Sequence, residues 1–158
     1  MGMSRWAGRV AVVVAAGPLV MSAVTAPAAG ATGPPGTPGT PEAERISAGP
    51  YEGFQMCQGP TLRVVSASPT LAASPTRPPG STASPFGPFP GLVGRFQVAR
   101  SSGEIVLRQA TPIENGRVFV FQVPQDRLPD GQYRWRMRAE NGTAASNWAP
   151  WCPFTLNS

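Results

Sequence analysis

The sequence of 158 residues predicts an all-β protein, a seven-stranded β-sandwich preceded by a signal peptide and a disordered segment rich in proline and glycine. Two observations support this prediction. Residues 133–139 alternate strictly between apolar side chains and arginines, which is typical of a strand with one buried face. In addition, short apolar runs are separated by Gly, Pro and Asn turns, and no stretch has the period of an amphipathic helix.

The first 31 residues have the pattern of a signal peptide. Arg5 and Arg9 precede an uncharged apolar run at 10–24, and small residues at 26–31 fit an A-x-A cleavage site. A retained membrane anchor is the alternative, although the run is shorter than the about 20 apolar residues of a spanning helix. We therefore expect a secreted or cell-surface protein that has no contact with the membrane after cleavage.

Residues 32–56 are predicted to form a disordered linker. Gly, Pro, Thr and Ala dominate this segment, and such a composition does not bury enough apolar area to offset the loss of chain entropy. The folded domain is therefore expected to cover residues 57–158, which is close to the length of a single β-sandwich.

Seven strands are expected within this domain. In order, they lie at residues 62–66, 70–73, 92–100, 105–109 and 117–123, in the segment that begins at Tyr133, and at 151–156. The fifth strand places Phe119, Phe121 and Val123 on one face. It ends at Pro124, because proline cannot donate to the hydrogen-bond ladder of a sheet.

Cys57 and Cys152 are the two cysteines of the chain, and in an exported protein such a pair predicts one disulfide. The bond would close nearly the whole folded part. A closed loop of about 100 residues corresponds to an upper figure of roughly 4–5 kcal/mol from chain entropy. A catalytic thiol is not supported, because the chain has no histidine to act as a base and no C-x-x-C spacing.

Two local sequence signals mark the two ends of the strand that begins at Tyr133. Leu128 lies five residues before Tyr133, with Pro-Asp-Gly between them, and this spacing predicts a tyrosine corner in which the hydroxyl bonds to upstream backbone. At the other end, Asn141-Gly142 predicts a tight primed turn, because both residues accept positive φ angles. The strand would then form a hairpin with the last strand of the domain.

The segment Leu128-Pro-Asp-Gly-Gln-Tyr-Arg-Trp-Arg-Met-Arg-Ala139, followed by Ser146-Asn-Trp-Ala-Pro-Trp-Cys-Pro-Phe-Thr-Leu156, resembles fibronectin type III-like modules of secreted proteins from high-GC Gram-positive bacteria. Residues 68–73 and 93–98 resemble earlier strands of the same module. The resemblance covers about residues 57–158 and implies an Ig-like β-sandwich with an accessory, scaffolding or binding role. In place of the family's acidic turn the chain has Arg77-Pro-Pro-Gly80, so no metal or partner role is carried over from that turn.

Three arginines and two tryptophans of this segment are predicted to form one stacked unit, which we call the Arg/Trp ladder. Its members are Arg134, Arg136, Arg138, Trp148 and Trp151. The two tryptophans are three residues apart, as in the W-S-x-W-S box of cytokine-receptor fibronectin modules, where the rings interleave with arginines. Cation–π contacts of this kind contribute about 0.5–1 kcal/mol each when exposed. The alternatives are tryptophans that stack on sugar rings and arginines that bind an anionic polymer.

The loop at residues 74–90 does not fit the sandwich pattern, because it is long, rich in proline and carries Phe86 and Phe89. Loops of this length without secondary structure are usually either functional or disordered. The two phenylalanines could form a binding tip, which would also suit an inhibitor of an extracellular protease. Alternatively, they fold back over the end of the sandwich.

The sequence offers little for catalysis, and we expect no enzyme activity, no metal and no cofactor. It lacks histidine and contains no nucleophile, phosphate-binding or metal-ligand motif. Its positive charge is small after the signal peptide is removed and is spread along the chain, which argues against nucleic acid. The expected function is therefore a structural or protein-binding module outside the cell, with cell-wall polysaccharide as the alternative partner.

Overall fold

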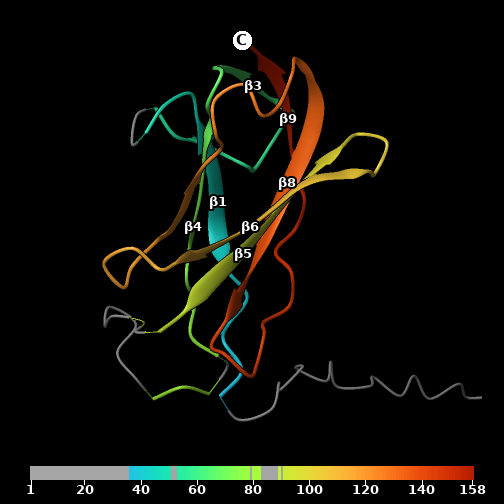
Figure 1. Cartoon of the computed structure of the whole chain (residues 1–158). Coiled ribbons are helices and arrows are strands. Elements are labelled where there is room, and N and C mark those ends of the chain that lie inside the picture. The colour runs from blue at the N-terminus through green and yellow to red at the C-terminus, as the bar shows by residue number, and fades with distance from the viewer. Residues whose placement is uncertain (1–35, 51–52, 79, 83–88, 90) are drawn as a thin grey trace, which may run out of the picture. The chain divides into compact units, whose positions relative to one another are not determined.

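The computed structural model describes residues 36–50, 53–78, 80–82, 89 and 91–158, which form an all-β fold of two sheets (Figure 1). The predicted fold class is confirmed. The strands are β1 (Glu42–Ser47), β2 (Gln55–Met56), β3 (Leu62–Val65), β4 (Thr70–Ser74), β5 (Val93–Arg100), β6 (Ile105–Pro112), β7 (Phe119–Gln122), β8 (Gly131–Glu140) and β9 (Cys152–Asn157). None of these described residues belongs to a helix that could cross a membrane. The predicted signal peptide at residues 1–31 lies outside the described part.

The strand order is β2-β1-β4-β7 in one sheet and β3-β9-β8-β5-β6 in the other. Neighbouring strands are antiparallel except β3 and β9, which pair in parallel, with Leu62 opposite Phe154. Figure 1 shows β5 and β6 running beside β8 across one side of the fold. The five-stranded sheet therefore brings together strands from the beginning, middle and end of the domain.

The prediction of seven strands was wrong by two, because β1 and β2 lie inside the segment expected to be a linker. Ile46 and Ser47 of β1 are fully buried, and Ile46 pairs with Leu71 of β4. The proline- and glycine-rich composition around β1 hides this strand. One buried isoleucine and a backbone ladder to β4 are sufficient here, because the rest of the sandwich supplies the core. The domain thus includes residues from at least Glu42 onward.

The core lies between the two sheets and is made of aromatic and aliphatic side chains from both. Phe96 of β5 packs against Phe121 of β7 with ring centroids 5.6 Å apart, and on its own sheet it stacks on Trp135 at 5.9 Å. Gly94 allows the sheets to approach closely, because a Cβ atom there would lie 2.9 Å from the Phe119 ring. Buried area in such a core is the main source of stability for the fold.

Cys57 and Cys152 form the predicted disulfide, with their Cα atoms 5.2 Å apart. Cys57 follows directly after β2, whereas Cys152 is the first residue of β9. The bond therefore joins the edge of the four-stranded sheet to the interior of the five-stranded sheet. It connects chain segments that lie 95 residues apart in the sequence.

The turn after β8 differs from the prediction of a tight two-residue hairpin. Gly142 has a positive φ of 92°, but Asn141 is not among the residues with positive φ, as a type I′ turn would require. Instead, the backbone N–H of Asn141 donates to the carbonyl of Ala144, and its side-chain oxygen accepts from the N–H of Ala144. The chain then returns through residues 145–151 before β9 begins at Cys152.

Candidate functional site

The candidate site is the side of the five-stranded sheet that points away from the core, which we call the outer face. The alternation of β8 creates it: Tyr133, Trp135, Met137 and Ala139 are buried, while the residues between them point outward and are partly exposed. At the start of β8, the Tyr133 hydroxyl donates to the Pro129 carbonyl at 2.8 Å, and Leu128 is buried beside it. This arrangement anchors the first turn of the strand.

The outward arginines of β8 and the two tryptophans lie in one alternating stack. The Arg134 guanidinium carbon lies 4.6 Å from the Trp151 ring centroid, and the Arg136 carbon lies 4.2 Å from the same ring. The Arg136 carbon is also 4.6 Å from the Trp148 centroid, and the Arg138 carbon follows at 4.8 Å. Each tryptophan ring is therefore in contact with two guanidinium groups. This is the geometry of the Arg/Trp ladder.

The return segment after β8 holds the tryptophans over the outer face. The Ser146 N–H donates to the Ala139 carbonyl, and the Ala149 N–H donates to the Met137 carbonyl, both at 2.8 Å. The Ser146 hydroxyl accepts from the Ala139 N–H at 3.0 Å. Ala149, between the two tryptophans in sequence, is buried. Backbone hydrogen bonds to β8 therefore fix both ends of the segment that carries Trp148.

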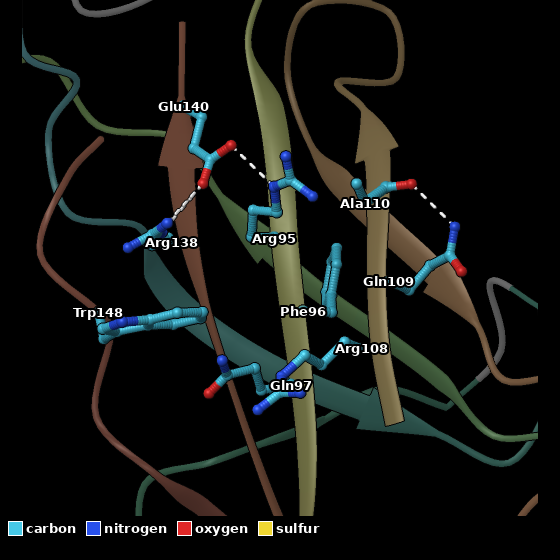
Figure 2. Close-up of a pocket in the computed structure, with 9 residues that line it drawn as sticks. All are labelled: Arg95, Phe96, Gln97, Arg108, Gln109, Ala110, Arg138, Glu140 and Trp148. Carbon is cyan, nitrogen blue, oxygen red and sulfur yellow. Dashed lines mark hydrogen bonds and ion pairs between the residues drawn. The ribbon is translucent and has the colours of Figure 1, made fainter. Parts of the chain in front are cut away.

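The ladder is tied to neighbouring side chains through the edges of its guanidinium groups. Arg136 donates from Nε and Nη2 to the Gln97 side-chain oxygen at 3.2 and 3.1 Å. Arg138 and Arg95 both bind Glu140, at 2.7 and 2.8 Å, as Figure 2 shows. These bonds leave the faces of Arg136 and Arg138 against tryptophan and use part of their edges for hydrogen bonding.

Two groups in this network have shifted pKa values. Partial burial, followed by the charges of Arg134 and Arg138, lowers the pKa of Arg136, which nevertheless stays protonated. Partial burial raises the pKa of Glu140, but hydrogen bonds from Arg95 and Arg138, together with their charges, outweigh it and bring the pKa of Glu140 below its usual value. Glu140 is thus held as a carboxylate between two arginines.

Three further arginines share the outer face, which the sequence reasoning missed. Arg95 of β5 lies opposite Arg138, Arg108 of β6 lies opposite Gln97, and Arg63 of β3 lies opposite Thr155 of β9. The positive charge is therefore gathered on one face and is not evenly spread. Period-2 alternation places each of these residues on one side of its own strand. Only the strand order brings the strands together.

Two hollows open on the outer face at opposite ends of the ladder. The first, of about 290 Å³, is lined by Arg95, Phe96, Gln97, Arg108, Gln109, Ala110, Arg138, Glu140 and Trp148 (Figure 2). The second, of about 420 Å³, is lined by Thr61, Arg63, Ser101, Gln132, Tyr133, Arg134, Pro153, Phe154 and Thr155. Of all these lining residues, only Glu140 is acidic. Both hollows can therefore accept negative charge.

The described part of the proline-rich loop at residues 74–90 does not form the binding tip that was one of its two interpretations. Phe86 lies outside the described residues. Phe89 is partly buried against the core, its N–H donates to the Gly116 carbonyl at 2.9 Å, and the Arg77 guanidinium lies 4.4 Å from its ring. Phe89 therefore packs onto the sandwich, as in the second of the two interpretations of this loop.

The acidic residues that the structure describes do not gather into a metal-binding cluster. No group of three or more His, Cys, Asp or Glu among them could hold a metal ion. Asp130 accepts hydrogen bonds from the Ser158 hydroxyl and backbone N–H, both at 2.7 Å, and these bonds lower its pKa. Asp130 thus fastens the C-terminal residue to the turn before β8.

Comparisons with known proteins give likenesses to solved structures alone. No family model matches the sequence, and no curated protein matches it. Among solved structures, the chain is similar to one described as the crystal structure of the C-terminal domain of wzt, with 12% identity over 76% of this chain and 75% of that chain and a TM-score of 0.49. A likeness at this level assigns no function.

Proposed function

We propose that the chain is an exported, non-catalytic, fibronectin type III-like binding module that presents the outer face to a partner outside the cell. The strand order supports the type of module. β1-β4-β7 and β6-β5-β8-β9 correspond to strands A-B-E and C′-C-F-G of Ig-like sandwiches. The disulfide supports export, because such bonds persist in oxidising compartments and are rare in the cytosol.

The gathering of arginines on the outer face is the observation that carries the binding role. Cation–π stacking gives the three ladder arginines a structural role. It does not account for Arg63 and Arg108, whose guanidinium groups have no partner among the described residues and add like charge to the same face. After partial burial, which is the larger cause, the charges of Arg134 and Arg138 also lower the pKa of Arg136. A partner with negative charge would relieve the repulsion between these like charges, which gives the face a function that the sandwich itself does not require.

The same geometry argues against sugar stacking on the tryptophans. A sugar ring needs an uncovered aromatic face, but Trp148 and Trp151 each contact two guanidinium groups. The partly buried Phe89 likewise does not support a protease-inhibiting tip in the proline-rich loop. The binding role is therefore best assigned to the charged edges of the arginines.

Site-specific photocrosslinking on intact cells tests this proposal. A photoreactive residue is placed at Arg108 on the outer face or, as a control, at exposed Gln122 on the opposite sheet. We expect export, an intact disulfide by mass spectrometry, and adducts with cell-surface material from position 108 only. Retention in the cytosol with free thiols, or equal adducts from both positions, would contradict the proposal.

A further inference from the structure

We propose that the outer face binds a linear acidic polysaccharide, whose carboxylates occupy the two hollows on either side of the Arg/Trp ladder. This inference rests on the proposed binding role and specifies the chemistry of the partner. Three features of the outer face support this ligand. They are the guanidinium N–H donors without an acceptor in each hollow, the distance between the hollows, and the hydroxyl and amide groups beside the charges.

The first hollow has more positive charge than its one carboxylate balances. Glu140 is already bound by Arg95 and Arg138, and the bonds run to both of its oxygens. Arg108 is exposed on the edge strand β6 and has no side-chain partner among the described residues (Figure 2). Its five donors are free to bind a carboxylate in a bidentate manner, which is the strongest geometry for such a pair.

The second hollow has two arginines and no acidic lining residue. The Arg134 Nε atom is buried and has no hydrogen-bond partner within the described part of the chain. Arg63 is exposed on β3, and its guanidinium also lacks a partner among the residues that the structure describes. A bound carboxylate would supply acceptors for these cations. The exposed Arg63 and the absence of any acidic lining residue therefore make this hollow a second place for negative charge.

The separation of the hollows favours a polymer over a small anion. Arg63 on β3 and Arg108 on β6 are four strand spacings apart, which is roughly 19 Å at about 4.8 Å per spacing. Arg134 and Arg138 are four residues apart along β8, or about 14 Å. A single small anion fills one hollow only. A chain with a charge on each repeat can reach both hollows at once and gain from their effective concentration.

The neutral groups of the hollows favour sugars over other polyanions. Hydroxyls of Thr61, Ser101 and Thr155 and the amide of Gln97 lie beside the arginines, and they can donate to and accept from sugar hydroxyls. Single-stranded nucleic acid, in contrast, is bound by stacking its bases on free aromatic faces. Guanidinium groups occupy those faces in the ladder. The outer face therefore fits an acidic glycan better than a nucleic acid.

Calorimetric titration of the disulfide-bonded protein with polygalacturonate oligomers tests the inference. Arg63→Gln and Arg108→Gln remove cations that have no side-chain partner among the described residues. Arg127→Gln makes the same charge change in the loop between β7 and β8, and Arg127 lines neither hollow. We expect each outer-face variant to weaken binding about tenfold or more, because a hydrogen bond to a charged group contributes about 1.5–3 kcal/mol. Arg127→Gln should bind as the original chain does.

The methyl-esterified oligomer serves as a ligand control, since it keeps the sugar backbone but loses the charge. We expect it not to bind, and binding of the free acid should weaken as salt is added. Equal binding of the ester, wild-type affinity in both outer-face variants, or tighter binding of polyphosphate, polyglutamate or single-stranded DNA would overturn the inference. If position 108 crosslinks on cells but polygalacturonate does not bind, the choice of ligand fails while the binding role stands.

Discussion

A double-mutant cycle between Arg134 and Trp151 measures whether the ladder is an energetic unit. The Arg134 guanidinium carbon lies 4.6 Å from the Trp151 ring centroid, and Arg134 has no side-chain hydrogen bond within the described residues. Substitution of Arg134 therefore removes mainly its cation–π contact. The substitutions Arg134→Met and Trp151→Leu keep apolar bulk and remove the charge or the π system. Because Arg134 is partly buried, we expect a coupling of about 1 kcal/mol, between the exposed and desolvated values for cation–π pairs.

The control cycle pairs Arg134→Met with Trp148→Leu. Arg134 does not contact the Trp148 ring, because Arg136 and Trp151 stand between them in the stack. We expect a coupling within about 0.3–0.5 kcal/mol of zero for this pair. Both cycles are measured by urea unfolding with the disulfide intact, followed by circular dichroism so that loss of tryptophan does not alter the signal. Equal couplings in the two cycles would refute a stacked ladder.

The remaining predictions concern the frame around the ladder. Replacing both Cys57 and Cys152 by alanine should lower the free energy of unfolding by up to about 4–5 kcal/mol and reduce the urea midpoint. Gly94→Ala should lower Tm, at a cost of about 1–3 kcal/mol, because its Cβ would meet a buried phenylalanine ring at 2.9 Å, whereas Gly49→Ala, in open space, should have almost no effect. Glu140→Gln should destabilise the fold above about pH 4.3. The folded pKa of Glu140 is lowered, so its contribution is complete above the unfolded value and should disappear from pH titrations of stability as pH falls through the folded one.

Alternation along single strands explains why much of the fold was predictable. In β8 the buried and outward residues follow each other without exception from Tyr133 to Ala139, and the tryptophans that complete the ladder lie close by in the sequence. Arg134 and Trp151 face each other because β8 and the return segment are neighbours along the chain. The local sequence pattern was sufficient to predict the ladder, because its arginines and tryptophans are separated by fewer than twenty residues.

Non-local pairing explains what the sequence did not reveal. β1 has one large apolar residue, Ile46, and becomes a strand because Leu71 and its neighbours in β4 supply the ladder. Likewise, Arg63 joins the outer face only through the parallel pairing of β3 with β9. Neither pairing leaves a periodic signal in the segment concerned. Composition therefore predicted a linker where a strand forms, and a dispersed charge where the sheet gathers it.

The ladder also restricts how its arginines can bind a partner. The faces of Arg136 are used by two rings and part of its edge by Gln97, so a ligand can meet only the remaining N–H groups in the plane of the guanidinium. Such in-plane contacts are directional and suit a planar carboxylate. A lysine at this position would keep the charge but lose both the stacking and the fork of donors. The outer face is therefore specific for the shape of the anion as well as its charge, and this specificity follows directly from the packing that stabilises the sheet.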